Sequence, residues 1–324
     1  MKSCWIQSET KGTSFLFRDV PEPQPKAGEI VVRVRAASLN RGELLAQSAH
    51  YKADAPRPAG GDAAGEVHAV GEGVTGFKSG DRIMGRGQGC FAEYAALRVE
   101  QVVPVPERLS WEQAAAIPLA YVTVYEMLYP YGKLKAGETL LVAGASSGVG
   151  VGCIQTGKAI GAKVIATSRS AEKLAKLKAV GLDLGIESRD GKFAEKVLEA
   201  TGGEGANLGI NLVGGSLFPE LVRSLANKGR LAIVGSLDGS KEGMLDLSAV
   251  HAKRLQIYGV SNARMSPADR AEAMRGFARE MLPMFGDGRI VPLVDKVFPF
   301  DELPAAKAYV EGDAQVGKVV VRLA

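Results

Sequence analysis

Seven small residues in the middle of the chain carry the clearest chemical signal. The run Gly144-Ala145-Ser146-Ser147-Gly148-Val149-Gly150 follows the apolar segment 139–143 and leads into a helical stretch over 149–160. Glycines placed between a strand and a helix let backbone N–H groups approach a pyrophosphate at the helix N-terminus. We expect the last glycine, Gly150, to let the helix pack closely on its sheet. A tight turn without a ligand would explain one glycine more easily than this whole run. The pattern therefore predicts a dinucleotide site formed by Ala145, Ser146, Ser147, Gly148 and Val149.

A second group of polar residues lies about twenty positions further on. An NAD site usually has an Asp or Glu there, on the ribose 2′-hydroxyl, but this chain has Ser168 and Arg169, with Lys173 one helical turn later. A hydroxyl, a bidentate guanidinium and a point charge together suit a 2′-phosphate. A solvated helix start is the alternative, although positive charge there opposes the helix dipole unless an anion is nearby. The sequence predicts NADP(H) rather than NAD(H).

The elements that would hold these residues begin near Trp111. Apolar segments of about six residues alternate with helical stretches: strands at 139–143, 163–167, 182–186, 208–213, 230–234 and 255–260, with helices near 149–160, 171–180, 193–200 and 217–226. This alternation predicts a parallel, doubly wound sheet. The sixth segment, 255–260, is expected at a sheet edge, where an apolar strand invites pairing with a second copy. We therefore expect a homodimer.

The residues before Trp111 have a different pattern. Short segments separated by Gly and Pro read as strands at 30–34, 65–70, 81–84, 91–97 and 101–105, which is typical of a small barrel or sandwich. The C-terminal part shows one helical stretch near 268–285 and a final strand at 318–323, and we expect it to return to the first domain. The expected division is a catalytic domain over 1–118, a dinucleotide-binding domain over 119–260, and a return to the catalytic domain over 261–324.

Composition limits the possible classes of protein. A length of 324 residues suggests about two domains, and 46% hydrophobic with 23% charged residues is ordinary for a globular chain rather than a disordered one. The net charge is only +4, and no run of Lys or Arg suggests nucleic-acid binding. The longest apolar run, 114–125, contains Pro118 and is too short to cross a membrane, and the N-terminus lacks the apolar stretch of a signal peptide. We expect a cytoplasmic protein without a membrane partner.

Cysteines and histidines give no metal signal. None of them has the spacing of a zinc site, and the odd number of cysteines suits a reducing compartment rather than a disulfide framework. They are Cys4, Cys90, Cys153, His50, His68 and His251.

Motifs along nearly the whole chain resemble one known family. They are 36–43 (AASLNRGE), 60–67 (GGDAAGEV), 71–74 (GEGV), 80–83 (GDRI), 91–94 (FAEY), 118–123 (PLAYVT), the glycine turn, and 317–320 (GKVV). In this order they resemble the medium-chain dehydrogenase/reductase superfamily, in its zinc-independent, quinone oxidoreductase-like (zeta-crystallin-like) branch. The resemblance implies an α/β protein with a GroES-like β-barrel catalytic domain and a Rossmann cofactor domain.

The resemblance also bears on the metal. Zinc-dependent members of this family have a Cys where Asn40 stands and a Gly-His-Glu where Gly61-Asp62 stands, and they insert a four-cysteine lobe where this chain has only the short loop 86–91. Nothing here would polarise an alkoxide, so zinc-assisted alcohol oxidation is disfavoured. The glycine turn also looks like that of a short-chain dehydrogenase. However, the Tyr-x-x-x-Lys of that family should follow the turn, and Tyr129 to Lys133 precedes it.

Without a metal, the chemistry best served is hydride transfer from NADPH to a quinone or an α,β-unsaturated carbonyl, which leaves charge on an oxygen that needs only hydrogen bonds. The resemblance points to the same two classes. It implies that Asn40 helps hold the nicotinamide ribose, that Glu43 keeps the carboxylate type often found at its position, and that Tyr51 hydrogen-bonds or protonates the acceptor oxygen. A turn cap at Asn40 and a packing role for Tyr51 are the alternatives. Tyr121 either narrows the pocket or fills core.

Other site residues are implied by the resemblance alone. Thr123 would reach the nicotinamide, Val213 and the turn Gly235-Ser236-Leu237 would border it, and Lys318 would close the cleft. Ser188 stands where the family often has a tyrosine beside the adenine, and neighbouring Arg189 could substitute for it.

Two other functions stay open. An enoyl-thioester (enoyl-CoA type) reductase would need a basic patch for a CoA phosphate, for which Arg41, Arg57 and Arg264 are candidates. The other is a non-catalytic protein that uses the fold and cofactor for stability, as some lens and RNA-binding relatives do; the low net charge argues against RNA.

Overall fold

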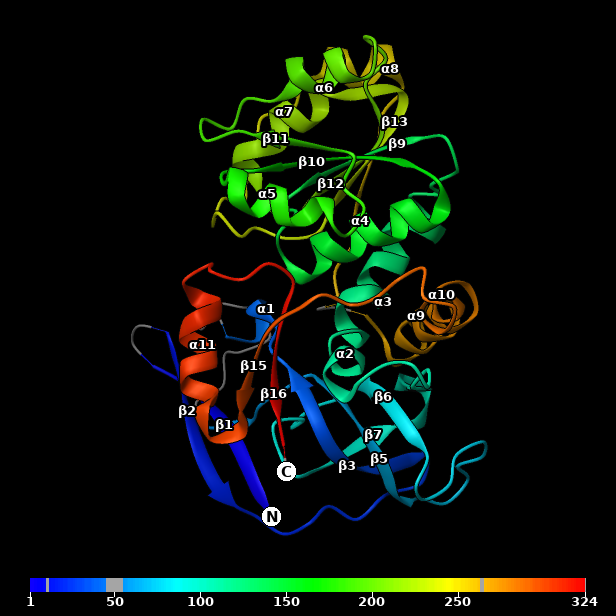
Figure 1. The fold of residues 1–324 in the computed structure, drawn as a ribbon, viewed down its shortest axis with the longest axis vertical. Coiled ribbons are helices and arrows are strands. Elements are labelled where there is room, and N and C mark those ends of the chain that lie inside the picture. The colour runs from blue at the N-terminus through cyan, green and yellow to red at the C-terminus, as the bar shows by residue number, and fades with distance from the viewer. Residues whose placement is uncertain (10–11, 45–54, 263–264, 324) are drawn as a thin grey trace. The chain divides into compact units, whose positions relative to one another are not determined.

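A computed structural model describes residues 1–9, 12–44, 55–262 and 265–323 (Figure 1). The chain forms two compact units: unit 1 contains Met1–Val122 and Ala263–Ala324, and unit 2 contains Thr123–Asn262. The boundary at Val122 falls inside helix α3 (Pro118–Glu126), which therefore contributes residues to both units. The sequence-based boundaries lie a few residues earlier at each crossing.

Unit 1 is built on two β-sheets. The smaller has the order β2-β1-β4 and the larger the order β15-β16-β3-β5-β6-β8, with β7 also paired to β3. The strands are β1 (Lys2–Ser8), β2 (Thr13–Asp19), β3 (Glu29–Ser38), β4 (Arg57–Pro58), β5 (Asp62–Val70), β6 (Arg82–Arg86), β7 (Tyr94–Arg98), β8 (Val102–Pro104), β15 (Val294–Pro299) and β16 (Lys318–Arg322). This β-rich unit confirms the fold class expected for the first domain. Strands β1, β2, β4 and β15 were not predicted. β2 and β15 lie at sheet edges with few fully buried side chains and so show little alternation, and β4 has only two residues.

Strand β3 is the centre of unit 1. It pairs antiparallel with β5, β7 and β16, and its apolar side chains join a core that includes Ile30, Val32, Leu97 and Val319. The carboxyl end of β3 thereby lies beside the start of β5, where Ser38 is opposite Asp62, and beside β16, where Ser38 is opposite Val320.

Unit 1 has four helices of nine residues or fewer besides α9, which has 14, among its described residues, and it shares α3 with unit 2. Its own helices are α1 (Arg41–Leu44), α2 (Trp111–Ala115), α9 (Pro267–Glu280), α10 (Leu282–Gly286) and α11 (Leu303–Glu311), with 3-10 turns η1 (Val99–Gln101) and η4 (Phe300–Glu302). The single helix predicted near 268–285 is wrong in one respect, because it is broken at Met281 into α9 and α10. Pro283 has no N–H to donate and is tolerated only in the first turn of a helix, so a new helix begins just before it.

Unit 2 contains one parallel sheet with the order β11-β10-β9-β12-β13-β14. Its strands are β9 (Thr139–Ala143), β10 (Lys163–Ser168), β11 (Leu184–Glu187), β12 (Ala206–Asn211), β13 (Leu225–Ile233) and β14 (Gln256–Gly259). The chain moves outward from β9 to β10 and β11, and then returns to the other side of β9 with β12. This is the predicted doubly wound sheet, and its switch point lies at the carboxyl ends of β9 and β12.

The helices of unit 2 connect these strands. They are α4 (Gly148–Ile160), α5 (Ala171–Lys178), α6 (Ala194–Ala200), α7 (Phe218–Arg223) and α8 (Leu247–Lys253), with the π-helical turn η2 (Met127–Tyr131) and the 3-10 turn η3 (Gly215–Leu217). Among the described residues, no helix is both long and apolar enough to span a bilayer.

Candidate active site

The glycine-rich turn joins β9 to α4 at the switch point of the sheet. Ser147 is the N-cap of α4: its Oγ accepts from the Gly150 amide (3.0 Å) and donates to the Gly144 carbonyl (3.0 Å). The amides of Gly148 and Val149 have no protein acceptor within the part of the chain that the structure describes. Two first-turn donors are therefore left for an anion, at the end of the helix where the dipole favours negative charge.

Two glycines give this region its shape, and one expectation needs correction. A Cβ at Gly150 would lie 2.6 Å from the carbonyl oxygens of both Gly144 and Ala145, so Gly150 keeps the turn tight rather than seating the helix on the sheet. The close contact between helix and sheet is made at Gly157, where a Cβ would lie 2.8 Å from a Leu140 methyl group. The Gly150 assignment was wrong because the turn folds back on its own first residues.

The predicted 2′-phosphate residues lie at the end of β10 and the start of α5. Arg169 is exposed, and Ser168 and Lys173 are half-buried. Ser170 caps α5 by accepting from the Lys173 amide (3.3 Å), and its own amide donates to Ser168 Oγ (3.2 Å). Positions 169–171 hold no acidic residue. The first carboxylate after β10 is that of Glu172, which precedes Lys173 and pairs with Lys176 (2.9 Å).

The end of β12 contains a residue that sequence analysis missed. Asn211 is 1% exposed; its Oδ1 accepts from the amides of Val213 (3.0 Å) and Gly214 (2.9 Å), and its Nδ2 donates to the Gly214 carbonyl (2.9 Å). This fixes Val213 in a turn at the carboxyl end of β12. The signal that could have revealed it is a buried Asn that ends an apolar strand just before a Gly-Gly pair.

The remaining residues predicted in unit 2 are placed as follows. Gly235, Ser236 and Leu237 form an exposed turn that begins just after β13. Thr123 is buried, and its Oγ1 accepts from Asn262 Nδ2 (3.0 Å), so the first and last residues of unit 2 are joined by a side-chain hydrogen bond.

Ser188 and Arg189 follow β11 and behave differently. Ser188 Oγ donates to the Lys192 carbonyl (3.0 Å), whereas the guanidinium of Arg189 is exposed and pairs with Glu187 (2.9 Å).

A second polar site lies in unit 1, with Asn40 at its centre. The Asn40 Nδ2 group donates to Glu43 Oε1 (2.8 Å) and to Asp62 Oδ2 (3.0 Å). Its Oδ1 accepts from the Lys318 ammonium (2.6 Å), which also donates to the Leu39 carbonyl (3.0 Å). Both amide hydrogens of Asn40 are thus committed to carboxylates of the protein. Lys318 is 6% exposed, and its ammonium is held between Asn40 and the Leu39 carbonyl; its predicted role in closing the cleft stays a prediction.

Asp62 is the residue of this network to which the sequence assigned no role. It is completely buried and accepts from Ser38 Oγ (3.1 Å), Asn40 Nδ2 (3.0 Å) and the Leu119 amide (3.2 Å), with the Lys318 ammonium 4.0 Å away. The pairing of β3 with β5 and β16 brings these groups together although they are far apart in the chain. We call Asn40, Glu43, Asp62 and Lys318 the polar cluster.

Glu43 occupies space that a side chain at position 61 would need. A Cβ at Gly61 would lie 2.2 Å from Glu43 Oε1. Burial, and next the charge of Asp62, raise the pKa of Glu43 to about 7, against the opposing influence of Asn40, Lys318 and Arg86. Burial also lowers the pKa of Lys318, while Asp62 and Glu43 oppose this.

Two predicted residues need separate mention. Tyr51 lies outside the described residues. Tyr121 is 1% exposed and packs edge to face on Phe285, with ring centroids 5.0 Å apart, so of its two expected roles the structure supports core filling.

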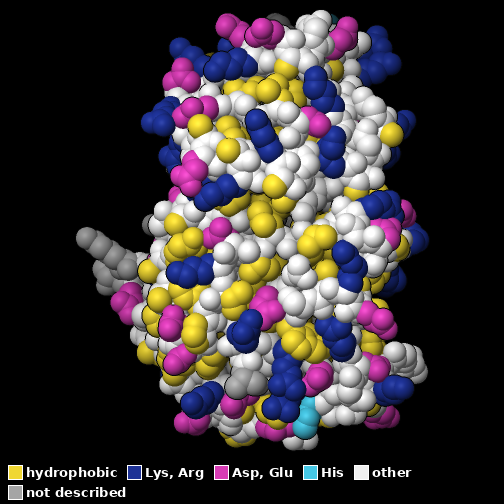
Figure 2. All heavy atoms as spheres, viewed as in Figure 1, with side chains coloured by type: hydrophobic (Ala, Val, Ile, Leu, Met, Phe, Trp, Pro, Cys, Tyr) yellow, Lys and Arg dark blue, Asp and Glu magenta, His cyan; other side chains and the backbone are white. Residues whose placement is uncertain are grey.

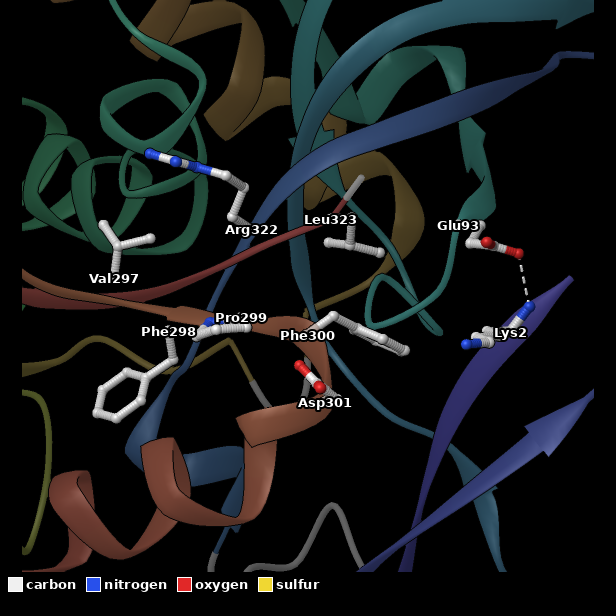
Figure 3. Close-up of a pocket in the computed structure, with 9 residues that line it drawn as sticks. All are labelled: Lys2, Glu93, Val297, Phe298, Pro299, Phe300, Asp301, Arg322 and Leu323. Carbon is white, nitrogen blue, oxygen red and sulfur yellow. Dashed lines mark hydrogen bonds between the residues drawn. The ribbon is translucent and has the colours of Figure 1, made fainter.

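Unit 1 also has a hollow of about 610 Å³ (Figure 3). It is lined by β15, η4 and the ends of β1 and β16, with Phe298, Pro299 and Phe300 on one side. Among its lining residues, the Lys2 amide donates to Glu93 (2.7 Å), and Arg322 pairs with Glu112 (2.6 Å). It contains no residue of the predicted site.

The metal-binding residues of a zinc enzyme have no counterpart in this geometry. The described ranges contain no group of three or more His, Cys, Asp or Glu side chains that could hold a metal ion. At the two positions compared with zinc-dependent relatives, the chain has Asn40 inside the polar cluster and Gly61 beneath Glu43.

Comparison with known proteins identifies the family. Residues 26–107 match the model of the alcohol dehydrogenase GroES-like domain, and residues 148–279 match that of the zinc-binding dehydrogenase. The acryloyl-coenzyme A reductase of Metallosphaera sedula is 30% identical over 99% of both chains.

Three solved structures each align over 100% of both chains. They are an NAD-dependent alcohol dehydrogenase (29% identity, TM-score 0.87), a mycobacterial protein in complex with NADPH (27%, 0.87) and a mycobacterial quinone oxidoreductase (28%, 0.86). The GroES-like unit, the doubly wound sheet and these full-length matches show that the chain belongs to the medium-chain dehydrogenase/reductase superfamily.

Proposed function

We propose that this oxidoreductase uses NADPH to reduce a quinone or an α,β-unsaturated carbonyl compound, without zinc. The observation that carries the proposal is a combination of two features in unit 2. The turn at the switch point has open amides, and the end of β10 has Ser168 and Arg169 where an NAD site usually has an acid, with Lys173 in the first turn of α5.

The residues of unit 2 fit the coenzyme. The amides of Gly148 and Val149 would bind the pyrophosphate, and the glycine-rich turn leaves no room for a side chain at Gly150. Ser168, Arg169 and Lys173 would bind the 2′-phosphate, and Val213, Thr123 and the turn at 235–237 would border the nicotinamide. When bound, NADPH supplies the hydride. Because one similar structure is named NAD-dependent and another holds NADPH, the coenzyme preference is part of the test.

The acceptor classes follow from the side chains of unit 1. Asn40, Glu43 and Tyr51 are the proposed acceptor-side residues. Hydride addition to a conjugated carbon leaves negative charge on an oxygen, which hydrogen bonds and one proton can neutralise without a metal.

Reduction of an enoyl thioester is a second candidate, favoured by the 30% identity with an acryloyl-coenzyme A reductase over the full chain. The structure describes two of the three basic residues named for a CoA phosphate. Arg41 on α1 is paired with Asp313, Arg57 is half-buried on β4, and Arg264 lies outside the described residues.

A homodimer and a cytoplasmic location complete the proposal. Strand β14 is paired only on its β13 side within the described sheet, and it exposes Ile257. Its open edge suits pairing with a second copy. RNA binding is not favoured: basic and acidic side chains are interspersed on the face shown in Figure 2, as the net charge of +4 would suggest.

The test is a calorimetric titration of the purified protein with NADPH and NADH, followed by NADPH oxidation assays with a quinone, an enone and acryloyl-CoA. Tight NADPH binding with turnover is expected, and the best acceptor decides between the two functions. Tight binding without turnover on any of the three would favour a non-catalytic role. Absence of binding would contradict the coenzyme proposal.

A further inference from the structure

The two carboxyl groups of the polar cluster are bonded very unequally. Asp62 accepts from three donors, while Glu43 accepts from Asn40 alone. The second oxygen of Glu43, Oε2, is inaccessible to solvent and has no hydrogen-bond partner among the described residues. Donors stabilise the ionised form of an acid and burial destabilises it, so a buried carboxyl group with one donor, as at Glu43, favours the protonated form.

The charged groups around Glu43 also favour its protonated form. It is faced by Asp62 on β5, Lys318 on β16, Arg86 on β6 and the buried thiol of Cys90. The ammonium of Lys318 lies 4.0 Å from Asp62 Oδ2, and it reaches Glu43 only through Asn40. Lys318 is therefore in ion-pair range of Asp62 and not of Glu43, and a proton is the simplest way to neutralise Glu43.

Gly61 fixes where this acid lies. Because a Cβ at position 61 would come within 2.2 Å of Glu43 Oε1, the carboxyl group can take this place only beside a glycine. Asn40 holds the same oxygen at 2.8 Å. The position of Glu43 is thus determined on two sides.

We propose that Glu43 holds the proton that the reduction consumes, and that Lys318, through Asn40, and Gly61 position it. The proposal rests on the proposed function and assigns a proton source to the same reaction. Lys318 and Gly61 act as positioning residues.

The step is balanced as follows. Bound NADPH would supply a hydride and leave as NADP+. The hydride brings two electrons to the acceptor carbon, the carbon–carbon or quinone double bond opens, and an oxygen of the acceptor becomes negative. The O–H bond of Glu43 breaks, and its proton neutralises that oxygen. Glu43 is left as a carboxylate and takes a proton from water before the next turnover. The raised pKa of Glu43, about 7, allows it to lose and regain a proton near neutral pH.

The first experiment locates the proton without any reaction. In ligand-free protein labelled with 13C at the glutamate side-chain carboxyls, one resonance should titrate near pH 7 and should be missing in Glu43→Gln. If the resonance that Glu43→Gln removes titrates in the ordinary glutamate range, near 4.3, the proposal is overturned. This result does not depend on the acceptor, so it separates this inference from the proposed function.

The second experiment asks whether the proton is used. With the best acceptor, kcat/KM of the wild type should fall as the pH rises through about 7, because Glu43 loses its proton there. Glu43→Gln should lower kcat/KM about a hundredfold and abolish this pH dependence. Wild-type rates and an unchanged profile in Glu43→Gln would overturn the role as proton source. Glu72→Gln, which changes an exposed acid on unit 1, is the control.

The positioning residues have their own readouts. Lys318→Met removes a cation that lowers the pKa of Glu43, so the decline in kcat/KM should move to higher pH. Lys318→Arg keeps the positive charge, so the decline should lie closer to that of the wild type.

Gly61→Ala should displace the Glu43 carboxyl and reproduce the loss of kcat/KM seen in Glu43→Gln. Gly286→Ala is its control, since a Cβ there meets nothing within 4 Å. An unmoved profile in both Lys318→Met and Gly61→Ala would contradict the positioning roles.

Discussion

The glycine turn of unit 2 and the polar cluster of unit 1 are built in opposite ways. The turn is made of backbone from one short stretch of sequence, and the Ser147 side chain ties it together by two hydrogen bonds. The polar cluster is made of side chains from α1, β5, β16 and the link between β3 and α1, and its members are separated by up to 278 positions. A substitution in the turn should therefore act on local shape, whereas one in the cluster should act through charge.

The largest effect is expected from removing the buried cation. Lys318→Met leaves the buried carboxylate of Asp62 without its nearest positive charge, because the ammonium lies 4.0 Å from Oδ2. We expect the free energy of unfolding to fall by about 3 kcal/mol, as for other buried pairs that lose one partner. Urea denaturation measures this. A loss below about 1 kcal/mol would show that the cluster is not held by charge.

The corresponding change in the turn is Gly150→Ala. Its Cβ would lie 2.6 Å from two carbonyl oxygens, so the turn must open. We expect a loss of about 2 kcal/mol in stability and at least tenfold weaker NADPH binding by calorimetry. Gly259→Ala, whose Cβ meets nothing within 4 Å, is the matched control in the same unit. It should neither lower the stability nor weaken NADPH binding.

The charged residues near the turn should affect only one coenzyme. Arg169→Ala removes a guanidinium from the proposed 2′-phosphate site, so the Kd for NADPH should rise about tenfold, equivalent to about 1.4 kcal/mol. The Kd for NADH should stay unchanged. Arg189→Ala should have a smaller effect, because Arg189 is paired with Glu187. An equal loss of affinity for NADPH and for NADH would place Arg169 outside the 2′-phosphate site.

The smallest effect separates capping from binding. Ser147→Ala and Ser266→Ala each remove an N-cap, on α4 and α9 respectively, and each should cost about 1 kcal/mol in thermal unfolding. Only Ser147→Ala should also weaken NADPH binding. If both variants bind NADPH as well as the wild type, the cap of α4 does not shape the coenzyme site.

The two sites also differ in how far sequence could predict them. The turn and the six parallel strands follow from local spacing, and Asn211 is the one residue there whose role went unnoticed. In the cluster, Asn40, Glu43 and Lys318 were named only through a family resemblance, and Asp62 was given no role. Strand register decides which distant side chains meet, and a single sequence does not reveal register between strands so far apart.

The effect of pH on stability follows from the same cluster. The folded-state pKa of Glu43 is raised to about 7 from 4.5, so the folded protein binds this proton more tightly than the unfolded chain. The contribution of this proton to the free energy of unfolding is fully present below about pH 4.5 and is lost as the pH rises through about 7. The measurement is the difference in the free energy of unfolding between wild type and Glu43→Gln across this pH range. The stabilisation of wild type relative to the variant should decrease as the pH rises through about 7.

The most direct test of the account is the fate of the hydride. NADPH carrying deuterium at nicotinamide C4, on the transferred face, is incubated with the protein and an enone, and the product is examined by NMR and mass spectrometry. We predict deuterium on the carbon β to the carbonyl and a solvent-derived proton at the α carbon. NADPH that binds but transfers no deuterium to the quinone, enone or thioester acceptors would contradict the assignment of this chain as a reductase of these compounds.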